Sequence, residues 1–288
     1  MYSLLIDPFL EYGFMQRALV GSILLCMGSV PVGIFMTLRR MSLTGDAMAH
    51  AILPGAAVAY LLSGLSLVGL TIGGVVAGLI VAVLAGLVAR ATHLKEDASF
   101  ATFYLISLAF GVLVISVKQS NVDLFHVLFG NILALDDSLL ILLSSISSIS
   151  TLLMAILYRP LVIECADPTF LVRLGYTSAI AHFGFLFLMV INLVAGFHAL
   201  GTLMAIGVMV LPAVTARFWV KTLDAILVTS LLLGIFGCYA GLLMSFYFDL
   251  PSGPSIIMAL GVVYGISLLL GTNGSWLQQL AWQRHLAG

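Results

Sequence analysis

The sequence predicts an all-α fold, a polytopic bundle of about eight or nine transmembrane helices that forms a single domain over residues 1–288. Of its 288 residues, 62% are hydrophobic and only 8% are charged. Soluble domains carry about 25% charged residues, so this chain has too few charges to cover a surface in water. Lipid is therefore the expected solvent for most of the molecule, and no basic run suggests a nucleic-acid partner.

Apolar stretches long enough to cross a hydrocarbon core of about 30 Å recur along the chain. They lie at about 18–38, 46–64, 66–89, 98–117, 138–158, 178–197, 199–216, 223–248 and 254–271. The connections at 64–66 and 197–199 are very short. If one of them is a break within a helix, the chain has eight spans and both of its ends lie on the same side.

The basic residues are distributed unevenly between the two faces of a nine-span arrangement. Of the 11 Lys and Arg residues, all but Arg17 and Lys118 fall on one face. Because Lys and Arg concentrate in cytoplasmic loops, this face is predicted to be cytoplasmic. The N-terminus is then outside and the C-terminus inside.

The segment 159–177, RPLVIECADPTFLVRLGYT, is too polar to span the membrane and too long for a simple turn. Within it, Asp167-Pro168 is typical of a helix N-cap followed by proline at the first helical position. A short amphipathic helix is expected over residues 168–174, with Gly175 at its C-cap. Such a helix would either rest on lipid or dock a cytoplasmic partner. Its apolar face would consist of Phe170, Leu171 and Leu174.

One carboxylate, Asp46, lies inside a predicted span, whereas the other acidic residues fall outside the spans or near their ends. Burying a carboxylate in hydrocarbon costs several kcal/mol unless it is compensated, so an ionisable residue there indicates a function. His50 is four residues on and shares a helix face with Asp46. With a rise of about 1.5 Å per residue, His50 lies roughly 15 Å beyond Arg40, near the middle of the membrane.

Carboxylate and imidazole groups are both ligands for zinc and manganese. One helix supplies only two donors, so a complete site needs others, and the same helix of a second protomer would give two Asp and two His. Other interpretations stay open. In one, Asp46 and His50 pair with each other. In another, Asp46 caps a helix N-terminus, because residues 42–45 look like a helix start. A proton relay is a third alternative.

The remaining histidines give weaker signals. His198, at the outer end of a span, would either receive a metal on entry or be a satisfied polar residue at the interface. His126 lies in an external segment, 121–137, that is acidic enough to attract cations or is simply solvated. His182, near the cytoplasmic end of a span, is ambiguous. The cysteines form no CxxC pair and are expected to be small buried residues: Cys26, Cys165 and Cys238.

Residues 38–55, LRRMSLTGDAMAHAILPG, resemble the signature of the permeases of bacterial ABC importers for zinc, manganese or iron, the ABC-3 family. The family pattern is LRRMSL-x-GDA-x-xHA-x-LPG, and the match includes Asp46 and His50. The resemblance covers nearly the whole chain in one order. Further matching segments are 96–98, 107–112, 121–124, 128–130, 167–175, 211–213 and 250–254.

The resemblance implies a permease homodimer in the bacterial cytoplasmic (inner) membrane, two cytoplasmic ATP-binding subunits and an extracytoplasmic metal-binding protein. It implies that Asp46 and His50 bind the metal at the dimer interface, and that 164–175 is the coupling helix to the ATPase. The transported metal would be Zn²⁺ or Mn²⁺, with iron possible. Zinc is slightly favoured because imidazole is a good zinc ligand. No cofactor would be bound permanently. Alanine at 49 and His198 replace the family's common Ser and Gln, which would affect metal choice or entry.

The chain has no GxxxxGK[ST] motif, so it is not expected to be an enzyme, and ATP hydrolysis would belong to a partner subunit. Two other transporters stay possible. A permease for a metal chelate such as a siderophore or cobalamin would need a wide cavity without ligands, which Asp46 and His50 disfavour. A gradient-driven secondary transporter often carries inverted repeats, but no second Asp-x-x-x-His segment occurs in the later half.

Overall fold

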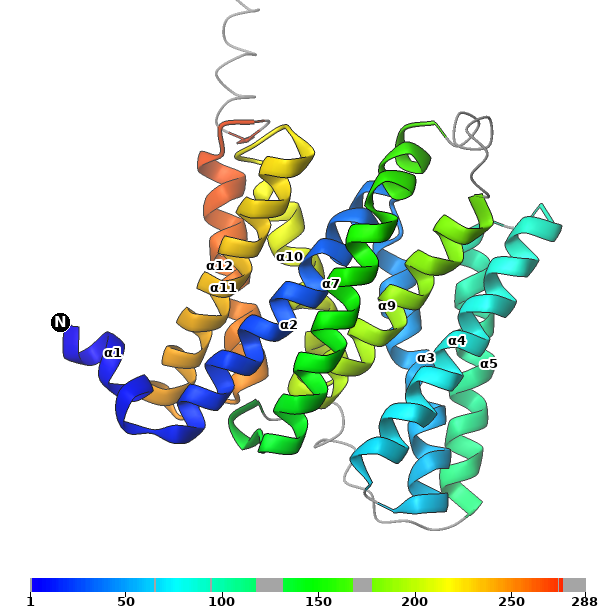
Figure 1. Cartoon of the computed structure of the whole chain (residues 1–288), viewed down its shortest axis with the longest axis horizontal. Coiled ribbons are helices and arrows are strands. Elements are labelled where there is room, and N and C mark those ends of the chain that lie inside the picture. Colours follow the sequence, from blue (N-terminus) through cyan, green and yellow to red (C-terminus); the bar gives the residue numbers. More distant parts are fainter. Residues whose placement is uncertain are drawn as a thin grey trace, which may run out of the picture.

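The computed structural model describes residues 2–64, 66–93, 95–117, 132–167, 178–273 and 275–276, and these parts are helical and contain no strand. The long helices lie side by side in one elongated bundle (Figure 1), which confirms the predicted all-α fold. The elements are α1 (Tyr2–Glu11), α2 (Gly13–Leu38), α3 (Ser42–Ser63), α4 (Leu67–Ala91), α5 (Glu96–Val117), the 3₁₀ turn η1 (Ile132–Ala134), α7 (Asp137–Ala166), α9 (Ser178–Leu200), α10 (Thr202–Ala216), α11 (Leu223–Phe248) and α12 (Ser252–Leu270).

Eight helices in the described part are long and apolar enough to cross a membrane. The predicted span at 199–216 is the exception, because its helix, α10, is shorter. Its 15 residues rise about 22 Å, less than the hydrocarbon thickness of about 30 Å. Gly201 has a φ of +86°, a conformation that favours glycine and reverses the chain between α9 and α10. Because α10 packs against α2, α9, α11 and α12, neighbouring helices cover it and it need not match the thickness of the lipid.

The helices alternate in direction through α2 to α5, α7 and α9 to α12 (Figure 1). The short α10 takes part in this alternation, so the start of α2 and the end of α12 lie at opposite ends of the bundle. This is the arrangement that nine passes predict. The break at Gly201 therefore separates two passes and does not interrupt a single helix.

Two helices, α2 and α9, form the centre of the bundle. In each of them 72% of an 18-residue apolar stretch is buried inside the protein, compared with 17% in α5. The outer helices instead expose large apolar side chains, which in a membrane would contact lipid. Representative exposed side chains are Ile80, Phe110, Leu152, Phe236 and Met258.

The ends of α2, α4 and α7 meet at one end of the bundle (Figure 1), which we call the basic end. Arg39 and Arg40 follow α2, and Arg90 lies in the last turn of α4. The structure thus brings together basic residues that the sequence placed on one face. That this face is cytoplasmic stays a prediction from the distribution of Lys and Arg.

Helix α7 continues to Ala166, so residues 159–166, expected to lie beyond the span, extend the same helix by about two turns. Pro160 lies inside the helix, and membrane helices tolerate such an internal proline. Leu161 is fully buried and anchors this last part of α7. Residues 164–166 therefore belong to α7, while the expected coupling residues Pro168 to Gly175 lie outside the described part of the chain.

The close contact of α3 with α4 depends on Gly55 and Gly73, because a Cβ on either would overlap the backbone carbonyl of the other. We expect Gly55→Ala to push these helices apart and to lower the free energy of unfolding by about 1–3 kcal/mol. Gly261 is a matched control in α12, since a Cβ there meets nothing within 4 Å. The thermal unfolding midpoint in detergent should fall for Gly55→Ala and not for Gly261→Ala. Equal midpoints would contradict the packing argument.

Candidate metal centre

Asp46 and His50 lie one turn apart on α3. This helix begins at Ser42 with Met41 at its N-cap, so Asp46 is the fifth helical residue and the alternative in which it caps the helix is wrong. His50 Nε2 is 3.9 Å from Asp46 Oδ1. This separation is too long for a hydrogen bond, so the two groups do not satisfy each other and both keep lone pairs for another ligand.

Both side chains face away from the packed interior of the chain. The Asp46 side chain is 58% exposed and that of His50 is 25% exposed, whereas Met48 and Ala51 on the same helix are fully buried. The exposed edge of α3 continues through Leu43, which is 74% exposed. A carboxylate on this edge of an apolar bundle needs compensation from outside the protomer.

The environment of α3 fixes where Asp46 and His50 lie. Thr44 Oγ1 donates a hydrogen bond of 2.9 Å to Asp97 Oδ1 at the start of α5. The Tyr104 ring of α5 lies 6.3 Å from the His50 ring, centroid to centroid, at an interplanar angle of 33°. Contacts with α5 therefore flank the two candidate ligands and orient the imidazole.

In the described part of the chain, no three His, Cys, Asp or Glu side chains gather into a metal site. Asp46 and His50 thus offer two donors and a transition metal needs about four or more. The chemistry of the pair, one carboxylate and one imidazole, fits a divalent metal. Further donors would have to come from another chain or from water.

His198 lies at the end of the bundle opposite the basic end, and its Nε2 is 3.0 Å from Thr71 Oγ1 on α4. The Thr71 hydroxyl already donates to the Leu67 carbonyl at 2.7 Å. Its oxygen must then accept from His198, which places the imidazole proton on Nε2. The histidine has the partner expected of a satisfied interface residue, and its Nδ1 keeps a lone pair that suits a metal ligand.

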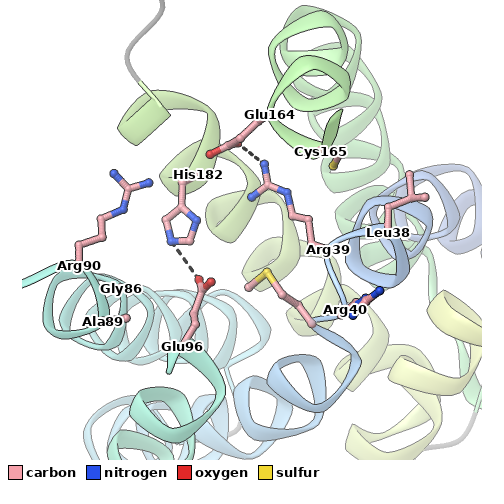
Figure 2. Close-up of a pocket in the computed structure, with 11 residues that line it drawn as sticks. Leu38, Arg39, Arg40, Gly86, Ala89, Arg90, Glu96, Glu164, Cys165 and His182 are labelled. Atoms are coloured by element: carbon pink, nitrogen blue, oxygen red, sulfur yellow. Dashed lines mark hydrogen bonds and ion pairs between the residues drawn. The ribbon is translucent and has the colours of Figure 1, made fainter. Parts of the chain in front are cut away.

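A polar cluster at the basic end was not predicted from the sequence. Arg39 pairs with Glu164, and His182 Nε2 is 3.2 Å from Glu96 Oε1. Both pairs, together with Arg90, line a cavity of about 470 Å³ (Figure 2). The only sequence signal was the position of these residues at span ends, because the contacts join residues far apart in the chain.

Other candidate residues have structural roles or lie outside the described part. Asp136, in the acidic external segment, caps α7 by accepting from the Leu139 N–H at 2.8 Å, and His126 is not among the described residues. Cys26 and Cys238 are buried as expected, with their Sγ atoms 3.6 Å apart. Cys165 is exposed, so the prediction that all the cysteines are buried is wrong there.

Comparison with known proteins decides the family. A family model described as the ABC 3 transport family matches residues 11–271. The chain belongs to this family. The permease resemblance that the motif around Asp46 and His50 predicts is thereby confirmed.

The relatives extend over nearly the whole of this ABC 3 family chain. The "Manganese import system permease protein ScaB" of Streptococcus parasanguinis is 30% identical and covers 94% of this chain and 95% of its own. The "Chelated iron transport system membrane protein YfeD" of Yersinia pestis is 29% identical, and the match covers 93% of this chain and 89% of that protein. The solved structure "PsaBC from Streptococcus pneumoniae in complex with Fab" has a TM-score of 0.84 at 29% identity, covering 97% and 99%. The predicted permease fold is therefore confirmed.

The hydrogen bond between Thr71 and His198 can be tested with a matched pair of substitutions. Thr71→Val leaves the buried side of the imidazole without an acceptor, which should lower the free energy of unfolding by about 1–3 kcal/mol. Thr102 on α5 also donates to the carbonyl four residues back but has no histidine partner, so Thr102→Val is the control. Urea or thermal unfolding of both variants should show a clear loss only for Thr71→Val, and an equal loss in both would refute the role of His198.

Proposed function

We propose that this protein is the permease subunit of an ATP-driven importer that moves a divalent transition metal into the cytoplasm. The observation that carries the proposal is the Asp46–His50 pair, which lies on an exposed edge of a membrane-length helix. Its membership of the ABC 3 transport family agrees with this function. The permease itself performs no chemistry, and ATP is hydrolysed by a partner subunit.

A second copy of the chain completes the metal site in this proposal. Two protomers related by a twofold axis present the same edge of α3 to each other. The shared site then has two carboxylates and two imidazoles, a donor set that suits a tetrahedral metal or one that retains water. Facing another protomer also removes the exposed Asp46 carboxylate from lipid, which resolves its unfavourable position in the single chain.

We place manganese first among the transported metals, followed by zinc and iron. The relatives described above are named for manganese import and for chelated iron transport, and neither name supports the slight preference for zinc that the imidazole suggests. Mixed oxygen and nitrogen donors accept all three metals, and Zn²⁺ binds most such sites more tightly than Mn²⁺. Selection for manganese would therefore depend on geometry and on which metal the external protein delivers.

The proposed partners act at the two ends of the bundle. An extracytoplasmic metal-binding protein docks near the start of α2 and releases the ion toward His198 and then Asp46 and His50. Two ATP-binding subunits dock at the basic end on residues 168–175, next to Asp167. The membrane is the bacterial inner membrane, with the N-terminus outside and the C-terminus in the cytoplasm.

Metal analysis of the purified dimer tests the site. Asp46→Asn replaces the two proposed carboxylate donors with neutral amides and His50→Ala removes the two imidazoles. Metal content and metal uptake should therefore fall by at least the roughly tenfold that loss of an outer-shell partner of a metal ligand costs. Asp224→Asn and His93→Ala are the matched controls, because both residues are exposed and lie toward the basic end, away from the proposed entry of the metal. Mass spectrometry of bound metal and uptake of radioactive Mn²⁺ provide the measurements.

Two results would contradict the proposal. Unchanged metal content in both Asp46→Asn and His50→Ala would reject the site. Uptake by the permease alone in liposomes, driven by an ion gradient without an ATP-binding subunit, would favour a secondary transporter.

A further inference from the structure

Arg39 connects three helices at the basic end. It directly follows α2 and forms an ion pair with Glu164 near the end of α7, and both side chains are only 10% exposed. Its guanidinium carbon also lies 4.7 Å from the centre of the Phe185 ring on α9. Figure 2 shows the Arg39 side chain directed toward Glu164, while the neighbouring Arg40 lies apart from the pair. One residue thus joins the end of α2 to both α7 and α9.

A second set of contacts joins α9 to α3 through α5. The His182 Nε2 atom on α9 lies 3.2 Å from Oε1 of Glu96, the first residue of α5, in a polar contact that lacks hydrogen-bond geometry. The next residue, Asp97, accepts the hydrogen bond from Thr44 at 2.9 Å. Thr44 lies in the first turn of α3, two residues before Asp46. The first turn of α5 therefore connects α9 to the helix that carries the proposed metal ligands.

Both sets of contacts connect α7 or α9 to the beginning of α3. Helices α7 and α9 flank residues 168–177, which would dock the ATP-binding subunit. The first set of contacts, made by Arg39, reaches the turn between α2 and α3. The second set, made through Asp97, reaches the first turn of α3. The turn between α2 and α3 is held by hydrogen bonds of 2.9 Å from the Arg39 and Met41 N–H groups to the Phe35 and Met36 carbonyls. The end of α7 is thereby connected to α3 through a short, hydrogen-bonded turn.

Stability alone does not account for a buried ion pair at this position. Desolvation offsets much of the attraction between buried charges, and apolar residues of similar volume stabilise a protein equally well or better. An ion pair differs from apolar packing in direction, because it fixes the end of one helix to a defined point on another. That property suits a joint that must move as a unit.

We propose that Arg39 is a positioning residue for transport, which couples the ends of α7 and α9 to the metal-binding helix α3. The contact between Glu96 and His182 acts in parallel through α5. The inference rests on the proposed function, since it takes residues 168–177 as the ATPase docking segment and Asp46 as a metal ligand. Movement of the docked ATP-binding subunits then changes the position of α3 relative to the partner protomer.

The test measures the ratio of metal transported to ATP hydrolysed in liposomes that contain the permease, its ATP-binding subunits and the external binding protein. Arg39→Gln and Glu164→Gln should each lower this ratio at least about fivefold, the lower end of the usual range for coupling between sites. Metal content and ATP hydrolysis should be retained. A merely structural role would lower uptake, hydrolysis and metal content together and leave the ratio unchanged.

Two further variants sharpen the test. Arg40→Gln is the matched control, because Arg40 has the same charge, lines the same cavity and is exposed, so its ratio should equal that of the wild type. The exchanged pair, Arg39→Glu with Glu164→Arg, should recover much of the ratio. A wild-type ratio in both single variants, or no recovery in the exchanged pair, would overturn the proposal. Failure of all the Arg39 and Glu164 variants to assemble would also overturn it, by assigning the pair to folding.

Asp46→Asn, measured alongside, separates this inference from the proposed function. If Asp46→Asn keeps its bound metal while Arg39→Gln lowers the ratio, the metal site is wrong and the coupling by Arg39 stands. If Asp46→Asn loses its metal while Arg39→Gln keeps the wild-type ratio, the site stands and the coupling is wrong. A wild-type complex that transports no metal with ATP would overturn both.

Discussion

A chain that lies mostly in lipid must satisfy its polar groups within the protein, and this requirement organises the centre of the bundle. Asn192 on α9 donates to Ser150 Oγ on α7 at 2.6 Å and to the Leu188 carbonyl at 2.8 Å. Ser150 in turn donates to the carbonyl of Gly28 on α2 at 3.2 Å. The two central helices, α2 and α9, are thus joined to α7 near mid-length by hydrogen bonds between buried groups.

The Asp46 carboxylate departs from this pattern. The buried Asn192 and the half-buried His198 find partners in the same chain, whereas Asp46 stays 58% exposed with His50 at 3.9 Å. Elsewhere α3 is in close contact with α4, as the approach of Gly55 to Gly73 shows. An exposed carboxylate on a helix of an apolar bundle is typical of a surface that is completed by another molecule. The fold therefore supports α3 firmly on its packed faces and leaves its ligands available on the edge.

The sequence predicted the parts of this structure that depend on local composition and spacing. The spans, the position of Asp46 and His50 on one helix face and the gathering of basic residues all follow from hydropathy, helical period and charge distribution. The length of α7 was missed, because Arg159 and Pro160 look like the end of a span, and only tertiary packing of Leu161 shows otherwise. The contacts of Arg39 with Glu164 and of Cys26 with Cys238 were also missed, since they join residues 125 and 212 positions apart and one sequence does not reveal which helices are neighbours.

An incomplete site in each protomer has a consequence for transport. A cage built from one chain would hold its metal with an affinity that changes little as helices tilt, and release would be slow. In the proposed dimer each α3 contributes only two donors, so affinity depends on the distance between two copies of the same edge. A small rotation of α3 would separate the donor pairs and weaken binding, which alternating access requires. Firm packing of α3 against α4 and α5 makes such a rotation a rigid-body movement, and the contacts of Arg39 place its control at the end of the bundle where ATP-driven movement would arrive.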